Sequence, residues 1–257
     1  MFFTDLGSAI DHGYSYKLYS KTLCDYIKVR LGCCINNTKV FYVEKNYTDA
    51  LWRATFTEHY SKTYYTEMSQ YCARIHFFSV TKSEVEKRRF TDEEYLGYIV
   101  LRPIPGIHAL GKIIMRIKKE MVDPNRSIKE IYSMLLPMEV SIIDLNLKIK
   151  IDAFPHYFQD KIALVCAGAA MNMVAYYLST KHPKDFPTYN PYIFFPKNLN
   201  RRSIPTDGLT VYEISKIFNA SGYRAHFNDF DNNKDLEDYL IAQIESNLPV
   251  ILDFDGH

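Results

Sequence analysis

The sequence predicts an α+β protein built in two parts. These are an N-terminal mixed α/β domain with a mostly antiparallel sheet over residues 1–150, and a second domain over residues 151–257. Short runs rich in β-branched and aromatic residues occupy the middle of the first part, which is typical of strands joined by turns. Residues 145–152 alternate apolar and polar side chains without a break, the pattern of a half-buried strand. Beyond residue 153 the pattern changes to long helical runs separated by irregular stretches.

The first elements of the N-terminal part are expected to be a helix, a strand and a second helix. Apolar and aromatic side chains keep helical spacing over residues 15–31, and Gly32 follows as a helix end. Residues 39–43 predict a strand, and residues 48–72 predict a longer helix with an aromatic face.

Three further runs predict the centre of the sheet. They cover residues 74–80, 95–101 and 112–117. Arg102-Pro-Ile-Pro-Gly106 separates the last two runs, and it predicts a loop because proline has no N–H to donate to a strand ladder.

The second part begins with a helix that is apolar nearly all round. This run, Cys166 to Leu178, is expected to be central and buried. Thr210-Val-Tyr-Glu213 has the spacing of a capping box and predicts a helix that ends at Gly222. The remaining expected elements are a strand at 223–227, a helix marked by Leu236, Leu240, Ile244 and Leu248, and a buried strand at 249–254 that leads to His257.

Composition excludes some classes of partner. Hydrophobic residues make up 47% of the chain, charged residues 24%, and the formal net charge is +1, so no electrostatic feature predicts nucleic acid or an anionic membrane as a partner. No apolar run reaches the roughly 18 residues of a spanning helix, and the N-terminus lacks the pattern of a secretory signal.

The cysteines and histidines predict neither a metal site nor a cofactor. The chain has five cysteines, an odd number without zinc-site spacing, which favours a reducing, cytoplasmic setting. Cys24 and Cys72 fall in helical patterns and are expected to be packing residues, whereas Cys33 and Cys34 follow a helix-ending glycine and are expected in a turn or at the surface. The histidines are scattered.

Cys166 and His257 are the candidate catalytic pair. A thiol at a helix N-terminus is more easily ionised, because the helix dipole stabilises the thiolate. His257, at the end of an expected buried strand, could act as its general base. First-turn N–H groups and the side chain of Gln159 could bind an oxyanion. Taken singly, Cys166 is also compatible with a small packing residue and His257 with a structural one.

The order of five motifs strengthens the catalytic interpretation. They are Gln159-Asp160, Cys166-Ala-Gly-Ala-Ala170, Gly208-Leu-Thr-Val-Tyr-Glu-Ile214, Leu248-Pro-Val-Ile-Leu252 and Gly256-His257. This succession resembles the papain-like cysteine peptidases, and it is most similar to the branch that contains bacteriocin-leader-processing peptidase domains and their free-standing bacterial relatives. The resemblance covers residues 155–257.

The resemblance implies a hydrolase that cleaves peptide or protein substrates through an acyl-enzyme. It assigns the nucleophile to Cys166, the general base to His257 and the oxyanion donor to Gln159. The family also places an Asp or Asn on a strand beyond its histidine, so we expect the papain-like domain to be truncated in this chain. The spacing from Gln159 to Cys166 is one residue longer than usual, and Ala167 stands where a glycine is common. The alternative is a non-catalytic papain-like module that binds peptides or has a regulatory role.

Overall fold

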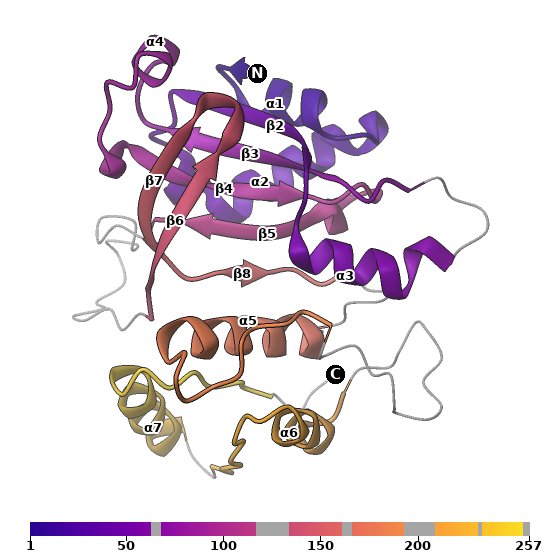
Figure 1. Cartoon of the computed structure of the whole chain (residues 1–257), viewed down its shortest axis with the longest axis vertical. Coiled ribbons are helices and arrows are strands. Elements are labelled where there is room, and N and C mark those ends of the chain that lie inside the picture. The colour runs from indigo at the N-terminus through magenta and orange to yellow at the C-terminus, as the bar shows by residue number, and fades with distance from the viewer. Residues whose placement is uncertain (63–67, 117–133, 161–165, 193–208, 231–232, 254–257) are drawn as a thin grey trace.

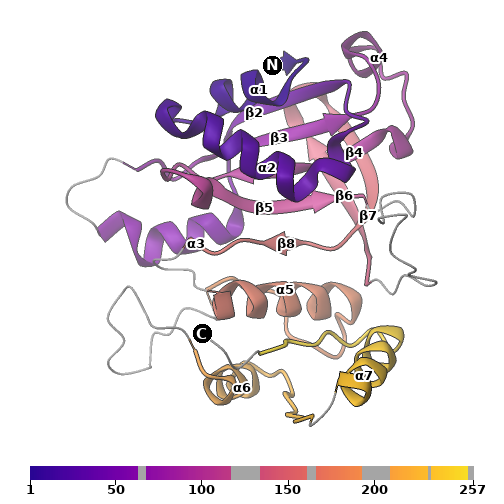
Figure 2. The ribbon, with the colours of Figure 1, turned by 180° about the vertical axis from the view of Figure 1, so that it is seen from behind.

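The computed structural model describes residues 1–62, 68–116, 134–160, 166–192, 209–230 and 233–253. A six-stranded sheet forms the upper part of the molecule, with two helices on one face and a β-hairpin on the other (Figure 1). Seen from behind, α1 and α2 cover the sheet, and α5, α6 and α7 lie below it (Figure 2). The mixed α/β class with an antiparallel sheet is therefore confirmed.

The six strands follow the order β1-β2-β3-β4-β5-β8, and every neighbouring pair is antiparallel. They are β1 (Phe2–Phe3), β2 (Val40–Tyr47), β3 (Cys72–Phe78), β4 (Tyr95–Leu101), β5 (Leu110–Met115) and β8 (His156–Tyr157). The three central runs expected from the sequence are thus confirmed as β3, β4 and β5. Because β1 and β8 are only two residues long, neither has a detectable sequence pattern.

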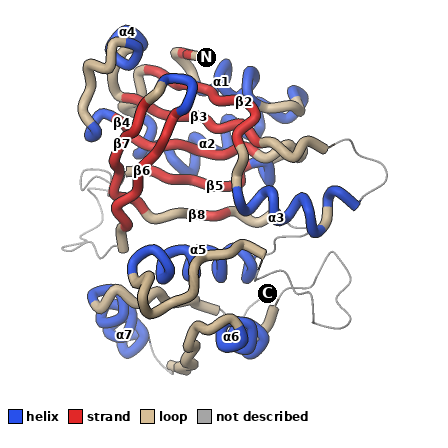
Figure 3. The backbone as a smooth tube through the Cα atoms, viewed as in Figure 1, coloured by secondary structure: helices blue, strands red, loops and turns tan. Residues whose placement is uncertain are grey.

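The helices occupy both parts of the chain (Figure 3). They are α1 (Leu6–Gly13), α2 (Ser20–Ile35), α3 (Ala50–Glu58), α4 (Lys82–Glu86), α5 (Cys166–Lys181), α6 (Val211–Ala220) and α7 (Asn233–Glu245). None of the described helices is long and apolar enough to cross a bilayer.

The two faces of the sheet differ in chemistry. Val43, Ile75, Ile99 and Ile113 are paired directly across four strands, and this apolar face packs against α1 and α2. Since side chains alternate along a strand, the residues between them point the other way. That second face carries polar and aromatic residues, namely Tyr42, Glu44, Arg74, His76, Tyr98, Lys112 and Tyr157.

A hairpin of β6 (Leu136–Ile142) and β7 (Leu147–Ala153) covers the polar face. The side chains of β7 are alternately buried and exposed, which confirms the strand predicted at 145–152. A one-turn 3₁₀ helix, Ile143–Leu145, and a left-handed Asn146 connect the two strands. The sequence did not predict β6.

Two predicted helices have different boundaries in the structure. The helix expected at 15–31 is confirmed from Ser20 onward as α2, which continues through Gly32 to Ile35, but its first part forms a 3₁₀ turn at Lys17–Tyr19, and α1 precedes it as a separate helix. Its buried face packs into the core, and this outweighs the roughly 1 kcal/mol by which an internal glycine disfavours a helix. Cys34 is therefore a half-buried helical residue rather than a turn residue, and Cys33 is also helical.

The helix expected at 48–72 is wrong over its second half. α3 ends at Glu58, a 3₁₀ turn follows at Tyr60–Lys62, and Cys72 is the first residue of β3. Cys72 is a packing residue, as expected, but in a strand. Residues 63–67 lie outside the described chain.

Around α5, the chain forms a second apolar cluster. Met171, Ala175 and Tyr177 of α5 are fully buried there, and Phe218 of α6 is buried beside them. Leu136 of β6 belongs to the same cluster, so the hairpin contributes to both cores. The domain boundary near residue 150 and the papain-like arrangement of the second part stay predictions.

The strands expected at 223–227 and 249–254 are not formed in the described chain. Residues 223–227 and 249–253 have no regular secondary structure. A strand is stabilised by ladder hydrogen bonds to a neighbour, and no described strand pairs with either segment.

Candidate functional site

Cys166 is the first residue of α5, and its side chain is exposed. The next three residues, Ala167, Gly168 and Ala169, are buried. The first N–H groups of an α-helix have no partner within the helix and carry its partial positive charge. The Cys166 thiol therefore lies at the helix start, beside these N–H groups, and is exposed to solvent.

The first half of α5 is anchored on two sides. Ala169 packs with Leu51 of α3 and Tyr157 of β8. Asn172 is fully buried, and its amide donates to the carbonyl of Gly168 at 2.8 Å and accepts from the Tyr189 hydroxyl at 2.8 Å. Because each polar group of this buried contact has a partner, the contact fixes this part of α5 relative to the segment that carries Tyr189.

The other described thiols are poor candidates for a nucleophile. Cys24 and Cys72 are buried, and burial raises the pKa of both thiols. Cys34 is half-buried and packs against the N-terminal core. Among the four cysteines whose side chains the structure describes, Cys166 alone is exposed.

Gln159 lies in the segment between β8 and α5, with a half-buried side chain. Its backbone carbonyl accepts a hydrogen bond from Nη2 of Arg102 at 3.0 Å, and the carbonyl of Phe158 accepts one from Nη1 at 3.1 Å. Nη2 also donates to the carbonyls of His108 and Leu110, at 2.6 and 2.8 Å. One buried guanidinium thus joins the β4–β5 connection to the segment that leads to Cys166.

Asp160 provides the negative charge beside this guanidinium. Burial lowers the pKa of Arg102, and the charge of Asp160 opposes that shift. Asp160 is itself only 2% exposed and accepts a hydrogen bond from the Tyr60 hydroxyl at 3.2 Å. The segment before Cys166 is therefore held by the attraction between these opposite charges as well as by hydrogen bonds to its carbonyls.

The structure describes two of the three predicted catalytic residues. Cys166 and Gln159 are placed as above, whereas His257 and residues 161–165 lie outside the described residues. Neither the Gln159 side chain nor the Cys166 thiol forms a hydrogen bond with another described residue.

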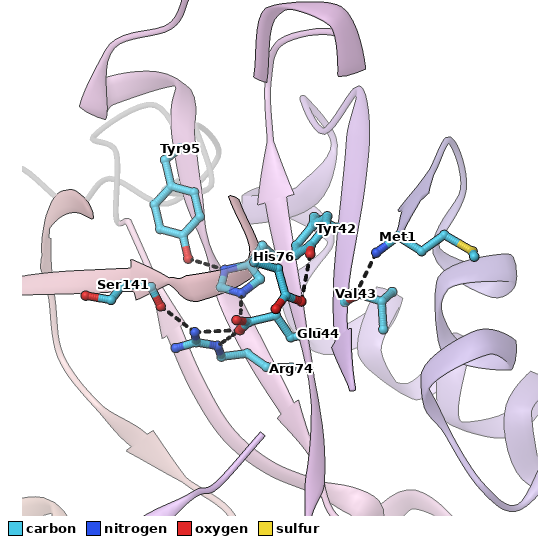
Figure 4. Close-up of polar contacts among 9 residues, drawn as sticks. Met1, Tyr42, Val43, Glu44, Arg74, His76, Tyr95 and Ser141 are labelled. Carbon is cyan, nitrogen blue, oxygen red and sulfur yellow. Dashed lines mark hydrogen bonds and ion pairs between the residues drawn. The ribbon is translucent and has the colours of Figure 1, made fainter. Parts of the chain in front are cut away.

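A buried polar cluster on the sheet was not expected from the sequence (Figure 4). Glu44 of β2 accepts from Nε of Arg74 at 2.5 Å and from Nε2 of His76 at 3.0 Å. Nδ1 of His76 lies 2.8 Å from the Tyr95 hydroxyl, and Nη2 of Arg74 donates to the carbonyl of Ser141 in β6 at 2.6 Å.

The cluster holds one carboxylate, one guanidinium and one neutral imidazole. Burial lowers the pKa of His76 to about 4, which the hydrogen bond to Glu44 only partly offsets. Burial would raise the pKa of Glu44, but its contacts with His76 and Arg74 outweigh burial and lower it. His76 therefore donates from Nε2 to Glu44 and accepts at Nδ1 from Tyr95. Since His76 has no exposed surface and Glu44 and Arg74 are also buried, we interpret this cluster as a structural one.

A second charged cluster, Lys112 with Asp49 and two tyrosines, lies on the same face of the sheet. Nζ of Lys112 lies 3.3 Å from a carboxylate oxygen of Asp49, and 6.0 and 5.7 Å from the ring centres of Tyr98 and Tyr157. Burial would lower the pKa of Lys112, but Tyr98, Asp49 and Tyr157 outweigh it and raise the pKa well above its ordinary value. The polar residues within otherwise apolar strands were the sequence signal for both clusters.

Metal chemistry has no candidate site in the part of the chain that the structure describes. No group of three or more His, Cys, Asp or Glu side chains there is arranged to hold an ion. No protein-family model matches the chain, and no curated protein or solved structure is similar to it.

Proposed function

We propose that this protein is a papain-like thiol peptidase in which Cys166 is the nucleophile. The observation that carries the proposal is the position of Cys166, an exposed thiol at the first residue of a 16-residue helix. The partial positive charge of the helix N-terminus stabilises the thiolate, which is the reactive form. The resemblance assigns the general base to His257 and the oxyanion donor to Gln159.

The reaction proceeds in two acyl-transfer steps. The Cys166 thiolate attacks the carbonyl carbon of a peptide bond, and the resulting oxyanion accepts hydrogen bonds from first-turn N–H groups of α5 and from the Gln159 side chain. His257, protonated when the thiol ionises, gives its proton to the leaving amine as the C–N bond breaks. Water, deprotonated by His257, then attacks the thioester, releases the carboxylic acid and restores the thiol.

Two features around Cys166 support this chemistry. The residues that follow Cys166, Ala167 and Gly168, are small and buried, so neither has a bulky side chain that could cover the exposed thiol. The hydrogen bonds from Arg102 fix the backbone of Phe158 and Gln159, so the Gln159 side chain extends from an ordered segment. All four cysteines with described side chains are free thiols, which supports a reducing, cytoplasmic setting. The peptide or protein substrate is implied by the resemblance.

A second candidate function is peptide binding or regulation without catalysis. The observation that favours it is the absence of strand structure at 249–253, within the described chain, immediately before the segment that carries His257. A general base needs a fixed position within hydrogen-bond reach of the thiol. A segment without strand pairing, such as 249–253, does not by itself hold His257 in such a position.

Covalent labelling distinguishes the two candidates. The protein and the variants Cys166→Ala, Cys34→Ala and His257→Ala are incubated with a peptide vinyl sulfone, and adducts are located by mass spectrometry of digests. A peptidase labels at Cys166 in the parent protein and in Cys34→Ala, the matched control for loss of another thiol. Cys166→Ala gives no adduct, and His257→Ala slows labelling by about a hundredfold or more.

Unchanged labelling of Cys166→Ala would contradict the assignment of the nucleophile. Labelling of Cys166 at equal rates in the parent protein and in His257→Ala would identify an accessible thiol without a general base. That result would favour the binding function. Circular dichroism of each variant establishes that it is folded.

A further inference from the structure

A cavity of about 310 Å³ opens at one end of the sheet, and neither Cys166 nor Gln159 is among its described lining residues. Its walls come from the end of α1, the ends of β2 and β4, and the segment that enters β3. Among the described residues that line it, four are basic, namely His12, Lys17, Lys45 and Arg102, and none is Asp or Glu. Hydroxyl groups of Ser69 and Tyr71 add hydrogen-bond donors.

The two lysines supply charge that the protein does not neutralise. Lys17 and Lys45 are exposed, and no carboxylate among the described residues lies within ion-pair distance of either one. Their charges also reach His12, whose pKa is lowered by burial first and then by Lys45, the N-terminal ammonium and Lys17. His12 is therefore neutral at neutral pH, while both ammonium groups are available for an anion.

A β-bulge brings Lys45 to the cavity. Glu44 pairs with Arg74 and Tyr47 pairs with Cys72, so two residues of β2 oppose one residue of β3. The second bulge residue, Asn46, has a left-handed backbone with φ of 59°. Bulges take side chains out of the regular alternation and are frequent beside binding sites. Here the bulge releases Lys45 and Asn46 from the ladder, and both line the cavity.

The wall formed by α1 is rigid. The Tyr14 hydroxyl donates to the carbonyl of Ile104 at 2.7 Å, which ties the end of α1 to the β4–β5 connection. An added Cβ on Gly13 would lie 3.1 Å from side-chain atoms of Ala73 and Val43, so the helix end packs closely on the sheet. The terminal N–H groups of Arg102 donate to backbone carbonyls. Arg102 therefore attracts an anion in the cavity through its positive charge rather than through hydrogen bonds.

We propose that this cavity binds the phosphate group of a small phosphate monoester. A monoester carries about −1.5 to −2 charges at pH 7, which matches the two free ammonium groups better than a single carboxylate does. Pockets for small molecules begin at about 300 Å³, so the volume suits a phosphate with a compact organic group. The neutral His12 and the hydroxyls of Ser69 and Tyr71 supply directional donors to the phosphate oxygens.

Titration with phenyl phosphate, inorganic phosphate and benzoate tests the proposal. Binding is followed by NMR through the imidazole signals of His12. Phenyl phosphate is expected to shift these signals in a saturable way and to bind at least about tenfold more tightly than benzoate, which has the same ring and one charge fewer. Inorganic phosphate is expected to compete for the same site.

Variants of the exposed lysines separate this site from general charge attraction. Lys17→Gln with Lys45→Gln is expected to weaken phenyl phosphate binding by about tenfold or more, and each single variant by a smaller factor. Lys234→Gln, at an exposed lysine of α7, is the matched control and leaves binding unchanged. Absence of a saturable shift at His12, equal affinity for benzoate, or unaltered binding by the double variant would overturn the proposal. The single variants give the same test if the double variant does not fold.

Discussion

His76 has its proton on the ring nitrogen that faces Glu44, and Tyr95 donates to the other nitrogen. This arrangement requires a neutral imidazole. The unfolded chain binds a proton at an ordinary histidine with a pKa of 6.5, whereas burial lowers the folded value to about 4. The folded state therefore resists protonation, and the free energy of unfolding falls as the pH is lowered from 6.5 to 4.

Replacing His76 with Gln removes this part of the pH dependence. The glutamine amide can still donate to Glu44 and accept from Tyr95, but it does not titrate. In the parent protein, His76 is expected to lower the free energy of unfolding by up to about 3 kcal/mol between pH 6.5 and pH 4, because each pKa unit corresponds to about 1.4 kcal/mol. Urea unfolding at several pH values measures the slope of the unfolding free energy against pH for the parent protein and for the variant.

The control for that experiment is His226→Gln, because His226 is exposed. Its slope is expected to match that of the parent protein. Equal slopes for His76→Gln and the parent protein would contradict a neutral, buried His76.

Arg74 acts at the scale of elements, because it joins three of them. It pairs with Glu44 of β2, lies in β3, and donates to Ser141 of β6. The hairpin β6–β7 is thus fastened to the polar face of the sheet by a buried charge. Removing one member of a buried pair leaves the other without compensation.

Arg74→Met is expected to destabilise the fold by about 3–5 kcal/mol. Glu44→Gln with Arg74→Met removes both charges and is expected to recover part of that loss. Unfolding free energies of the two single variants and the double variant form the thermodynamic cycle. Additive losses, with no recovery in the double variant, would contradict the direct coupling of the pair.

Sequence patterns predicted elements where the local signal was complete. β3, β4 and β5 combine length with β-branched and aromatic residues, β7 alternates regularly, and α6 has a capping box whose Glu213 N–H donates to the Thr210 hydroxyl at 3.3 Å. β6 contains Pro137 and has an imperfect alternation of burial, so its pattern was weak. The boundaries of α2 depend on packing against the sheet.

The position of Cys166 could be predicted from the sequence, whereas the buried polar cluster and the cavity could not. Cys166 at a helix start follows from the run of small and apolar residues after it, and the structure places it there. The cluster of Glu44, Arg74 and His76 depends on strand register between residues about 30 positions apart, as does the bulge that presents Lys45. Register is a long-range property, so a local pattern contains the residues without showing that they meet.

At the scale of the whole molecule, Arg102 joins the sheet to the α5 region. It is 3% exposed and donates to the carbonyls of His108 and Leu110, where the β4–β5 connection enters β5, as well as to those of Phe158 and Gln159. Lysine at this position has a single nitrogen and cannot serve four carbonyls in different directions. The start of α5 is therefore expected to depend on this guanidinium.

Arg102→Lys is expected to destabilise the protein by about 3 kcal/mol and to accelerate hydrogen exchange over residues 156–160 and the first turn of α5. Hydrogen exchange followed by mass spectrometry measures the local effect. Arg30→Lys, at an exposed arginine of α2, is the control and leaves exchange unchanged. Unaltered exchange at 156–160 in Arg102→Lys would contradict its role as a junction.

The chemistry of Cys166 is tested most directly by trapping its acyl form. The protein is mixed with a peptide p-nitrophenyl ester, quenched in acid during turnover, and analysed by intact mass and by digestion. We predict an adduct with the mass of the peptide acyl group on Cys166, absent in Cys166→Ala and accumulated by His257→Ala only slowly. An adduct on another cysteine, or turnover that is unchanged in Cys166→Ala, would contradict the assignment of Cys166 as the nucleophile.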